Sequence, residues 1–199
     1  MKTILAIDQG TTASKAALFS LSGRLLSLGR VPLKTRFGHG GSADQDPDEI
    51  LSSQRRAIRE ALAGAGRHEI VAAGIASQRS TFVIWDRATG RPIGAALTWQ
   101  STIAADRCSG LQKHGARVRR LTGLPLSPHY SASKIGHMLA ASRQARRRAQ
   151  RGDLLFGNVA TFLIWHLTEG KVHAVDPTQA ARTLLLNVAT LEWDPWLLE

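Results

Sequence analysis

The stretch that decides the fold is Ile7-Asp8-Gln9-Gly10-Thr11-Thr12-Ala13-Ser14-Lys15. It lies between two apolar runs, Ile4–Ile7 and Ala16–Phe19, which read as β-strands, so Asp8–Thr12 is predicted to be a hairpin turn and not a strand-to-helix P-loop. Gly10 permits a positive φ and the close approach of a phosphate to the backbone. The two threonines add hydroxyl and amide donors, which an anion-binding turn needs. The alternative interpretation of these residues is an ordinary hairpin with Gly and Thr in its turn.

Two charged residues flank this turn. Asp8 would repel a bare phosphate, but a carboxylate here makes sense if it holds hydrated Mg²⁺, which binds a few carboxylates and several waters. Lys15 adds a cation within reach of a phosphate oxygen. The sequence therefore predicts that Gly10, Thr11, Thr12 and Lys15 bind phosphate and that Asp8 binds metal.

The residues that follow predict a mixed α/β fold. A third strand, Leu25–Val31, completes an antiparallel meander, and Gly38–Ser42 is a Gly-rich loop. Asp46-Pro47-Asp48-Glu49 is a strong helix start, with a capping Asp, a Pro at the first helical position and an acid three residues on. An apolar stripe carries this helix to about Gly64. Two further strands are expected, at Ile70–Ala76 and Thr81–Trp85.

Helices dominate the sequence after Thr102. We expect one that breaks at Gly123-Leu124-Pro125, a second from Ser133 to about Arg147, and a third over Asn158–Thr168. No internal repeat and no clear linker interrupts the pattern. The chain reads as a single α/β domain, with a mixed sheet and flanking helices.

Composition excludes several classes of protein. Hydrophobic residues make up 43% of the 199 residues and charged residues 21%, a globular balance. Asp8 cuts the first apolar run too early for a signal peptide, and no stretch approaches the length of a membrane span. The single cysteine, Cys108, cannot form an internal disulfide. We therefore expect a cytoplasmic protein without a membrane partner.

The net charge of +11, from 26 basic and 15 acidic residues, suits anionic partners. Its densest patch is the run 143–151, in which Ala and Gln alternate with Arg and no aromatic residue is available to stack on bases. We interpret this run as a solvated helix face. Nucleic-acid binding is the less favoured alternative, and it predicts retention on DNA that depends steeply on salt.

An ordered series of motifs resembles the FGGY family of carbohydrate kinases, in particular its glycerol-kinase-like N-terminal domain. The series spans nearly the whole chain, which gives it its specificity, and consists of the opening Ile7–Lys15, Asp46–Ile50, Gly74–Thr81, Trp85-Asp86, Thr89-Gly90, Gly152–Val159, Leu163–Trp165, Asp176, Ala181–Leu184 and Leu191–Asp194.

The resemblance implies a fold, an activity and cofactors. The fold would be the ribonuclease-H-like domain of the actin, Hsp70 and sugar kinase superfamily, incomplete at its C-terminus. The activity would be ATP-dependent phosphorylation of a polyol or sugar hydroxyl, with ATP and Mg as cofactors and glycerol or a related carbohydrate as substrate. Positioning and electrostatics supply most of the acceleration in such phosphoryl transfer.

The same resemblance implies a substrate-binding face made by Gln78, Arg79, Ser80, Trp99 and His129. An arginine fork can donate two hydrogen bonds to vicinal hydroxyls, and Trp99 would form an apolar wall. Ser80 stands where glycerol kinases carry a glutamate, and His129 stands where they carry a tyrosine. Ser101-Thr102-Ile103 lacks the acid or cysteine and the arginines that the family usually has after its tryptophan. These departures predict an altered or relaxed polyol pocket. A solvent-facing loop histidine is the plainer interpretation of His129.

The resemblance ends at Glu199, before the aspartate that serves the family as catalytic base and before the C-terminal nucleotide lobe. We therefore expect residues 1–199 to be a truncated FGGY kinase N-terminal domain, or a free-standing domain that needs a complementary C-terminal lobe, and inactive alone in either case. The alternative function is a catalytically inactive binding or interaction module.

Overall fold

The computed structural model describes residues 1–66 and 68–199, and these divide into two compact units. Unit 1 comprises Met1–Thr35 and Gln45–Gln78, and unit 2 comprises Arg36–Asp44 and Arg79–Glu199. The chain passes between the units at residues 35/36, 44/45 and 78/79, where no Gly/Pro-rich or charged linker marks the change. The assignment of residues 1–199 to one kinase domain stays a prediction.

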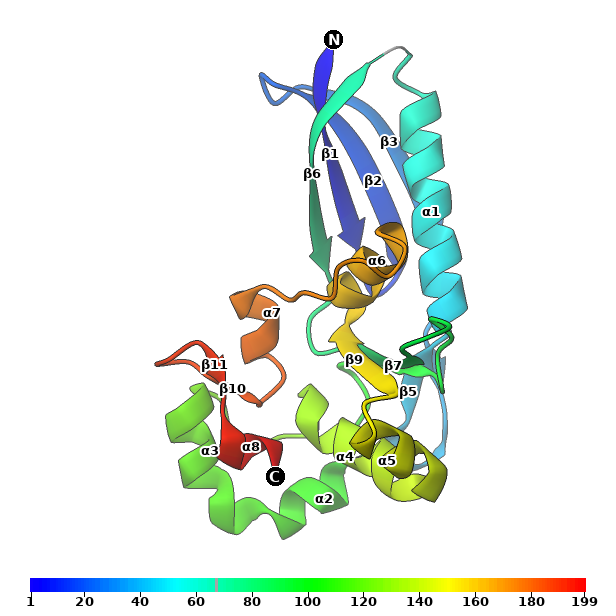
Figure 1. Cartoon of the computed structure of the whole chain (residues 1–199). Coiled ribbons are helices and arrows are strands. Elements are labelled where there is room, and N and C mark those ends of the chain that lie inside the picture. Colours follow the sequence, from blue (N-terminus) through cyan, green and yellow to red (C-terminus); the bar gives the residue numbers. More distant parts are fainter. Residues whose placement is uncertain (67) are drawn as a thin grey trace. The chain divides into compact units, whose positions relative to one another are not determined.

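Unit 1 is built on a mixed four-stranded sheet (Figure 1). Its strands lie in the order β3-β2-β1-β6, with β1 antiparallel to β2, β2 antiparallel to β3, and β1 parallel to β6. Their bounds are β1 Lys2–Gln9, β2 Ala13–Ser20, β3 Leu25–Pro32 and β6 Glu69–Ser77. The expected meander is present, and so is the later strand, whose parallel pairing with β1 the sequence did not predict.

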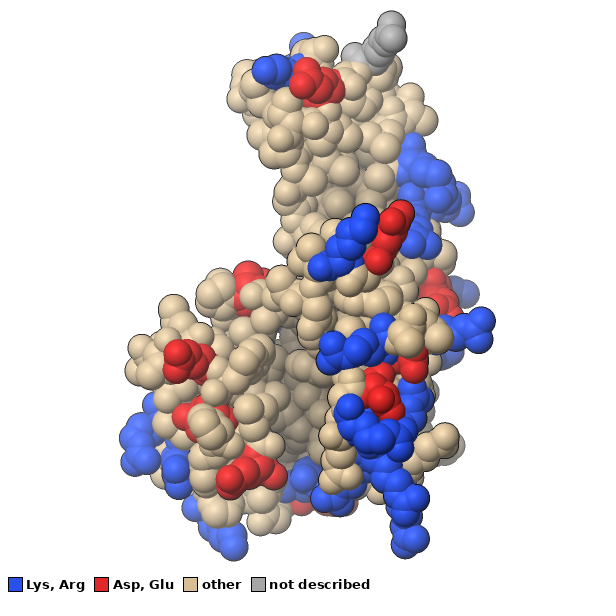
Figure 2. All heavy atoms as spheres, in the orientation of Figure 1, with Lys and Arg blue, Asp and Glu red and all other residues tan. Residues whose placement is uncertain are grey.

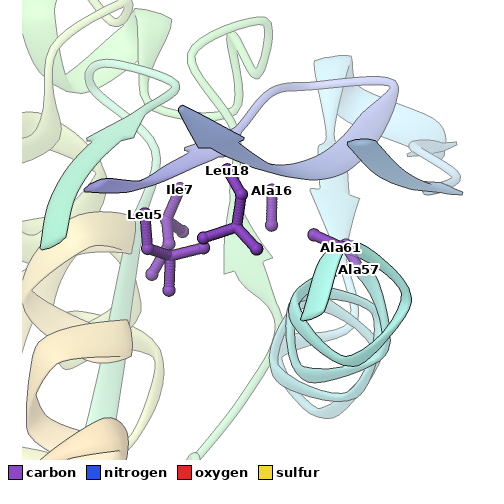
Figure 3. Packing of buried hydrophobic residues seen from close by; sticks show 6 residues of the cluster. All are labelled: Leu5, Ile7, Ala16, Leu18, Ala57 and Ala61. Atoms are coloured by element: carbon purple, nitrogen blue, oxygen red, sulfur yellow. The ribbon is translucent and has the colours of Figure 1, made fainter. Parts of the chain in front are cut away.

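One face of this sheet is covered by helix α1 (Pro47–Ala63). The helix begins where the sequence predicts, because the Asp46 side chain accepts a hydrogen bond from the Asp48 N–H at 2.9 Å. Alternate residues of β1 and β2 meet small residues of α1, as Figure 3 shows; this core cluster is Leu5, Ile7, Ala16, Leu18, Ala57 and Ala61. Gly29 of β3 lies so close to α1 that a Cβ there would fall 2.0 Å from the carbonyl oxygen of Ala57.

Strand β6 is the least covered part of unit 1. Seven of its nine residues, Glu69–Gly74 and Ala76, are exposed, among them Ile70 at 41% and Val71 at 45%. On the neighbouring β1, Ile4, which lies on the sheet face opposite α1, is 38% exposed. An apolar edge strand of this kind is a surface on which other polypeptide segments pair.

Unit 2 contains a five-stranded sheet in the order β4-β5-β8-β7-β9. Its strands are β4 Arg36–Phe37, β5 Ala43–Gln45, β8 Ala96–Leu97, β7 Phe82–Asp86 and β9 Leu154–Asn158, with Gln45 itself counted in unit 1. The sequence predicted β7 but read the segment before Asn158 without a strand. The Gly-rich loop holds a 3₁₀ turn, His39–Gly41, instead of being wholly irregular.

Helices make up most of the rest of unit 2 (Figure 1), as expected after Thr102. They are α2 Ala105–Gly110, the 3₁₀ turn Gln112–His114, α3 Gly115–Thr122, α4 Ser131–Ala141, α5 Arg143–Gln150, α6 Val159–Leu167, α7 Pro177–Ala181 and α8 Pro195–Leu198, and a small hairpin pairs β10 Leu186–Asn187 with β11 Glu192–Trp193.

Two helix boundaries test the sequence patterns. Helix α3 ends at Gly123, which adopts φ 71°, so the predicted break is confirmed. The single helix expected from Ser133 to Arg147 is wrong, because α4 ends and α5 begins at Ser142. There the extended backbone lets the Ser142 hydroxyl cap α5 by accepting from the Ala145 N–H at 3.1 Å.

The arginine run forms α5 and has no buried residue, in keeping with a solvated helix face. Figure 2 shows Lys and Arg side chains gathered in this region, with acidic side chains among them. Arg148 pairs with Asp86 at 2.5 Å, and Arg151 pairs with Asp153 at 2.7 Å. Part of the positive charge of the arginine run is thus paired with acidic side chains of unit 2. Within the described residues, no helix is long and apolar enough to cross a membrane.

Candidate functional site

The predicted phosphate turn lies at one end of the unit 1 sheet, between β1 and β2. The Gly10 N–H donates to the Ala13 carbonyl at 3.0 Å and closes the turn. The positive φ that Gly10 permits is not adopted, since its φ lies outside the left-handed region. Gly10 is needed for another reason: a Cβ there would come within 3.2 Å of the Ala13 carbonyl oxygen.

Three buried glutamine side chains, those of Gln9, Gln45 and Gln78, form a hydrogen-bond network that holds this turn. The Gln78 side-chain amide donates to Gln9 Oε1 at 3.0 Å and to Gln45 Oε1 at 2.7 Å. Gln9 in turn donates to the Gly10 carbonyl at 2.8 Å, and Gln45 donates to the Thr11 carbonyl at 2.7 Å. Because buried polar groups hold their geometry only when each is satisfied, this network fixes the turn's backbone before any ligand arrives.

Sequence reasoning missed Gln9 and Gln45 and assigned Gln78 to the substrate. The structure places Gln78 in unit 1, 8% exposed, with its amide among these hydrogen bonds. The signal that could have found the other two was their position: each is a polar residue at the end of a strand, on the face of the strand that is buried.

Asp8 and Lys15 are cross-strand neighbours on β1 and β2, on the sheet face opposite the α1 core. Lys15 Nζ lies 3.1 Å from Asp8 Oδ2, and both side chains are about half exposed, at 44% and 50%. An exposed pair of this kind is weak. Both groups can therefore exchange their mutual contact for a ligand.

The metal prediction rests on Asp8 alone. Across residues 1–66 and 68–199, no group of three or more His, Cys, Asp or Glu side chains is placed to hold a metal ion. One half-exposed carboxylate suits Mg²⁺, which keeps several waters and takes its other ligands from substrate phosphates. Asp8 would hold such an ion, which would neutralise charge on the phosphates.

In unit 2 the structure brings together three of the predicted substrate residues. Trp99, 37% exposed, lies with its ring 5.7 Å from the ring of His129. Ser80 Oγ donates to the Arg182 carbonyl at 3.4 Å, and Arg182 Nη2 lies 3.1 Å from His129 Nε2. Ser80, Trp99 and His129 thus belong to one cluster joined through Arg182. Arg79 is exposed beside it.

His129 is half-buried, so the interpretation of it as a solvent-facing loop histidine does not describe its environment. Desolvation lowers the pKa of His129, and the positive charges of Arg182, Lys134 and Arg79 lower it further. A lowered pKa favours the neutral form of the ring. Because an arginine can only donate, Nε2 accepts from Arg182 and the neutral ring carries its proton on Nδ1.

Ser80 occupies a strained position in this cluster. Its φ is 63°, and its side chain is 2% exposed. A non-glycine residue in the left-handed region is uncommon, and such strain concentrates at functional sites. Leu184, also buried, has φ 64° close to Arg182 in the chain.

Sequence reasoning missed two members of this cluster, Arg182 and Lys134. Arg182 was quoted only as part of the motif Ala181–Leu184, yet its guanidinium lies 4.9 Å from the Tyr130 ring and its buried Nε has no hydrogen-bond partner among the described residues. Lys134 is fully buried in α4. No sequence signal separates it from an ordinary surface lysine.

Comparison with known proteins agrees with this geometry. Residues 3–199 match the FGGY family of carbohydrate kinases, N-terminal domain. A glycerol kinase of Shewanella sp. (strain W3-18-1) is 46% identical over 202 residues, covering 100% of this chain and 41% of that protein. The chain therefore spans about two fifths of the length of the curated relatives it matches.

Solved structures give the same result. Plasmodium falciparum glycerol kinase with ADP superimposes with a TM-score of 0.93 at 28% identity, over 99% of this chain and 40% of that chain. Gluconate kinase from Lactobacillus acidophilus superimposes with a TM-score of 0.87 at 25% identity, over 99% of this chain and 39% of that chain. The expected sugar-kinase fold, ribonuclease-H-like as in actin and Hsp70, is confirmed.

Proposed function

Because this chain belongs to the FGGY family of carbohydrate kinases, we propose that it supplies the substrate-binding face and the first phosphate turn of a kinase. That kinase transfers the γ-phosphate of ATP to a hydroxyl of a polyol or sugar. The observation that carries the proposal is the cluster in unit 2, where Trp99, His129 and the strained Ser80 meet around Arg182.

Unit 1 would act on the nucleotide. The glutamine network holds the Gly10 and Thr11 carbonyls, so the backbone of the turn is fixed before a phosphate binds. The Gly10 N–H is donated to the Ala13 carbonyl and the Thr11 hydroxyl to Gln78 Oε1, so a phosphate would take over these contacts or bind the other donors of the turn. Lys15 would turn from Asp8 to a phosphate oxygen, and Asp8 would hold Mg²⁺. Preorganised donors of this kind stabilise developing charge without a reorganisation step.

Unit 2 would bind and orient the acceptor. Arg79 offers a fork of N–H donors to adjacent hydroxyls, and Nδ1–H of His129 offers one more. The half-exposed ring of Trp99 would cover carbon-bound hydrogens of the substrate. Holding the acceptor in this way aligns one hydroxyl for attack on phosphorus, which is the main contribution a protein makes to this reaction.

The substrate class is a polyol or sugar, with glycerol one member. Ser80 is shorter than a glutamate, and its hydroxyl turns to the Arg182 carbonyl, so it supplies neither a charge nor a long acceptor. His129 likewise offers a smaller group than a tyrosine. We propose a pocket that accepts larger carbohydrates, pentoses and pentuloses among them, beside or instead of glycerol.

The partner we propose is a C-terminal kinase lobe. The chain matches only 41% of its glycerol kinase relative, and β6 leaves an apolar edge on which further polypeptide can pair. Alone, the chain would turn over little or no ATP. A cytoplasmic location fits a kinase that uses ATP and a protein with one, unpaired cysteine.

Calorimetry tests this function with the 199-residue chain and a panel of glycerol, erythritol, xylitol, ribulose and xylulose. We expect binding of at least one compound, and a loss of about tenfold in affinity for Arg79→Ala, as for one charged hydrogen-bond donor. Arg91→Ala, which removes another exposed arginine of unit 2, is the matched control and should bind as the wild type.

The outcome that would contradict the proposal is the absence of binding by any polyol or sugar of the panel. That result would favour the alternative of an inactive interaction module that keeps the kinase fold. Binding that Arg79→Ala leaves intact would keep the function but remove Arg79 from the site.

A further inference from the structure

Lys134 is the feature of unit 2 that the proposed chemistry leaves without a role. It lies in the first turn of α4, and its side chain is completely buried, one of the largest such side chains in the described chain. Lysine is almost never fully buried unless its ammonium is paired, because removing the charge from water is unfavourable. Its burial therefore calls for a specific set of partners.

Those partners are three main-chain carbonyls. Nζ of Lys134 donates to Thr98 O at 2.7 Å, to His129 O at 3.0 Å and to Ser80 O at 3.4 Å. An ammonium has three N–H donors and no acceptor, so three carbonyls match its capacity. Hydrogen bonds from a charged donor are stronger than those between neutral groups.

The three carbonyls come from the three segments that carry the predicted substrate residues. Ser80 follows Arg79, Thr98 precedes Trp99, and His129 is itself a predicted ligand residue. The first two segments lie 54 and 36 residues from Lys134 in the chain, so no local turn brings them together. The buried ammonium group of Lys134 joins all three segments.

We propose that Lys134 is a positioning residue of the substrate site, whose ammonium fixes the spacing of the segments that carry Arg79–Ser80, Trp99 and His129. The inference rests on the function proposed above. Lys134 does not touch the substrate, because its side chain has no exposed surface. It acts through the backbone, and an apolar residue of similar size would fill the same space without holding the three carbonyls.

Neighbouring bonds support this arrangement and show what remains without Lys134. The Ser131 hydroxyl also donates to Ser80 O at 3.4 Å, and the Trp99 N–H donates to Thr81 Oγ1 at 3.1 Å. These contacts join the segments in pairs. Lys134 Nζ reaches all three segments at once.

The test compares Lys134→Met with Lys113→Met in the full 199-residue chain. Methionine keeps the length and apolar stem of lysine but removes its donors, and Lys113 is an exposed lysine of the same unit. Two quantities are measured: affinity for the tightest compound of the polyol and sugar panel, and hydrogen exchange of backbone amides along the chain.

We expect Lys134→Met to weaken polyol binding by about tenfold or more, the loss from misplacing charged and aromatic contacts. Amide exchange should rise at residues 79–81, 98–100 and 128–130 and stay unchanged across β1 and β2. Lys113→Met should match the wild type in both measurements. Unchanged affinity and unchanged exchange at the three segments would overturn the inference, as would a uniform rise through unit 2, which marks a merely structural role.

Two further outcomes remain decisive. If the wild type binds nothing in the panel, the proposed function fails, and exchange alone judges whether Lys134 holds the three segments. If Lys134→Met does not fold, Lys134→Arg replaces it: the larger guanidinium keeps charge and donors but displaces the carbonyls. We then expect polyol binding weaker by about threefold or more, and wild-type affinity would overturn the inference.

Discussion

Units 1 and 2 hold their predicted ligand groups in opposite ways. In unit 1 the phosphate turn follows from regular β-structure, and neutral glutamine amides brace it. In unit 2 the substrate residues lie on irregular segments, joined by a buried ammonium and a guanidinium. Every described non-glycine residue with a positive φ is in unit 2: Ser80, Glu169, Leu184 and Leu191. Strand pairing by itself positions a turn between two strands. A site made from segments far apart in the sequence needs buried charged groups, aromatic contacts and strained backbone to hold those segments together.

The two units also differ in their content of tryptophan, whose fluorescence reports on unfolding. All five tryptophans, at positions 85, 99, 165, 193 and 196, are in unit 2. Tryptophan fluorescence therefore reports unit 2 alone, while far-ultraviolet circular dichroism reports both units. Denaturation followed by both signals can separate a change in one unit from a change in the other.

The largest expected effect is in the aromatic core of unit 2. Trp85 is completely buried against Phe162 and Trp165, with ring centroids 5.3 and 6.0 Å apart. Trp85→Ala should lower the free energy of unfolding by about 3–5 kcal/mol. Urea titration followed by fluorescence of the remaining tryptophans measures this, and a loss below about 1 kcal/mol would show that the ring is not a core element.

The corresponding break in unit 1 is Gly29→Ala. The added Cβ would fall 2.0 Å from the Ala57 carbonyl oxygen, and backbone cannot rotate away as a side chain does. We expect a loss of about 1–3 kcal/mol, the usual cost of overpacking. Circular dichroism during urea unfolding checks it.

Gly74→Ala is the matched control, since a Cβ on that β6 glycine meets nothing within 4 Å. Its stability should stay within about 0.5 kcal/mol of the wild type. Equal losses for the two variants would contradict the close packing of β3 on α1.

The buried Lys134 of unit 2 predicts a pH dependence of stability. Burial lowers the pKa of Lys134 from 10.5 to about 7, so between these values the unfolded chain binds more protons than the folded protein. The penalty for burying the charge is complete below pH 7 and is relieved as pH rises to 10.5. Stability from this group should therefore increase by up to about 1.4 kcal/mol per pH unit in that window.

Because other groups titrate too, the measured quantity is the stability of the wild type minus that of Lys134→Met at each pH. The difference should rise from pH 7 to 10. A flat difference would mean that the lysine titrates alike in the folded and unfolded chain, and a falling one that its ammonium is stabilised, and its pKa raised, by folding.

The smallest effect is expected at the start of α1. Asp46 caps the helix through the Asp48 N–H, and Asp46→Ala should lower stability by about 1 kcal/mol. Asp46→Asn, which keeps a capping oxygen, is the control and should lose only a few tenths. Equal losses for both would assign the effect to charge rather than to capping.

The parts of the fold that sequence predicted well rest on local rules. The β1 strand, the Asp46 cap and the Gly123 helix end each depend on a few neighbouring residues, and all three are present. The break at Ser142 was missed because Ser is also tolerated inside helices. The positive φ that glycine permits at position 10 is not adopted; the backbone there instead lies close to the Ala13 carbonyl, which sequence alone does not show.

The candidate site was predictable only where the motifs named its residues. Resemblance pointed to Ser80, Trp99 and His129, and the structure brings these three together. It could not indicate Lys134, whose partners are backbone carbonyls far apart in the sequence. Nor could it indicate the φ of Ser80, because strain of this kind depends on tertiary contacts.

The most direct measurement of the central claim is ATP-dependent phosphorylation of the polyol and sugar panel, with and without a partner lobe. The chain is assayed alone and after addition of the separately produced C-terminal part of the Shewanella glycerol kinase relative. We predict no appreciable turnover by the chain alone, and turnover that appears on mixing and is lost in Arg79→Ala. Clear substrate-dependent turnover by the 199 residues alone would contradict the claim that they hold only part of a kinase site.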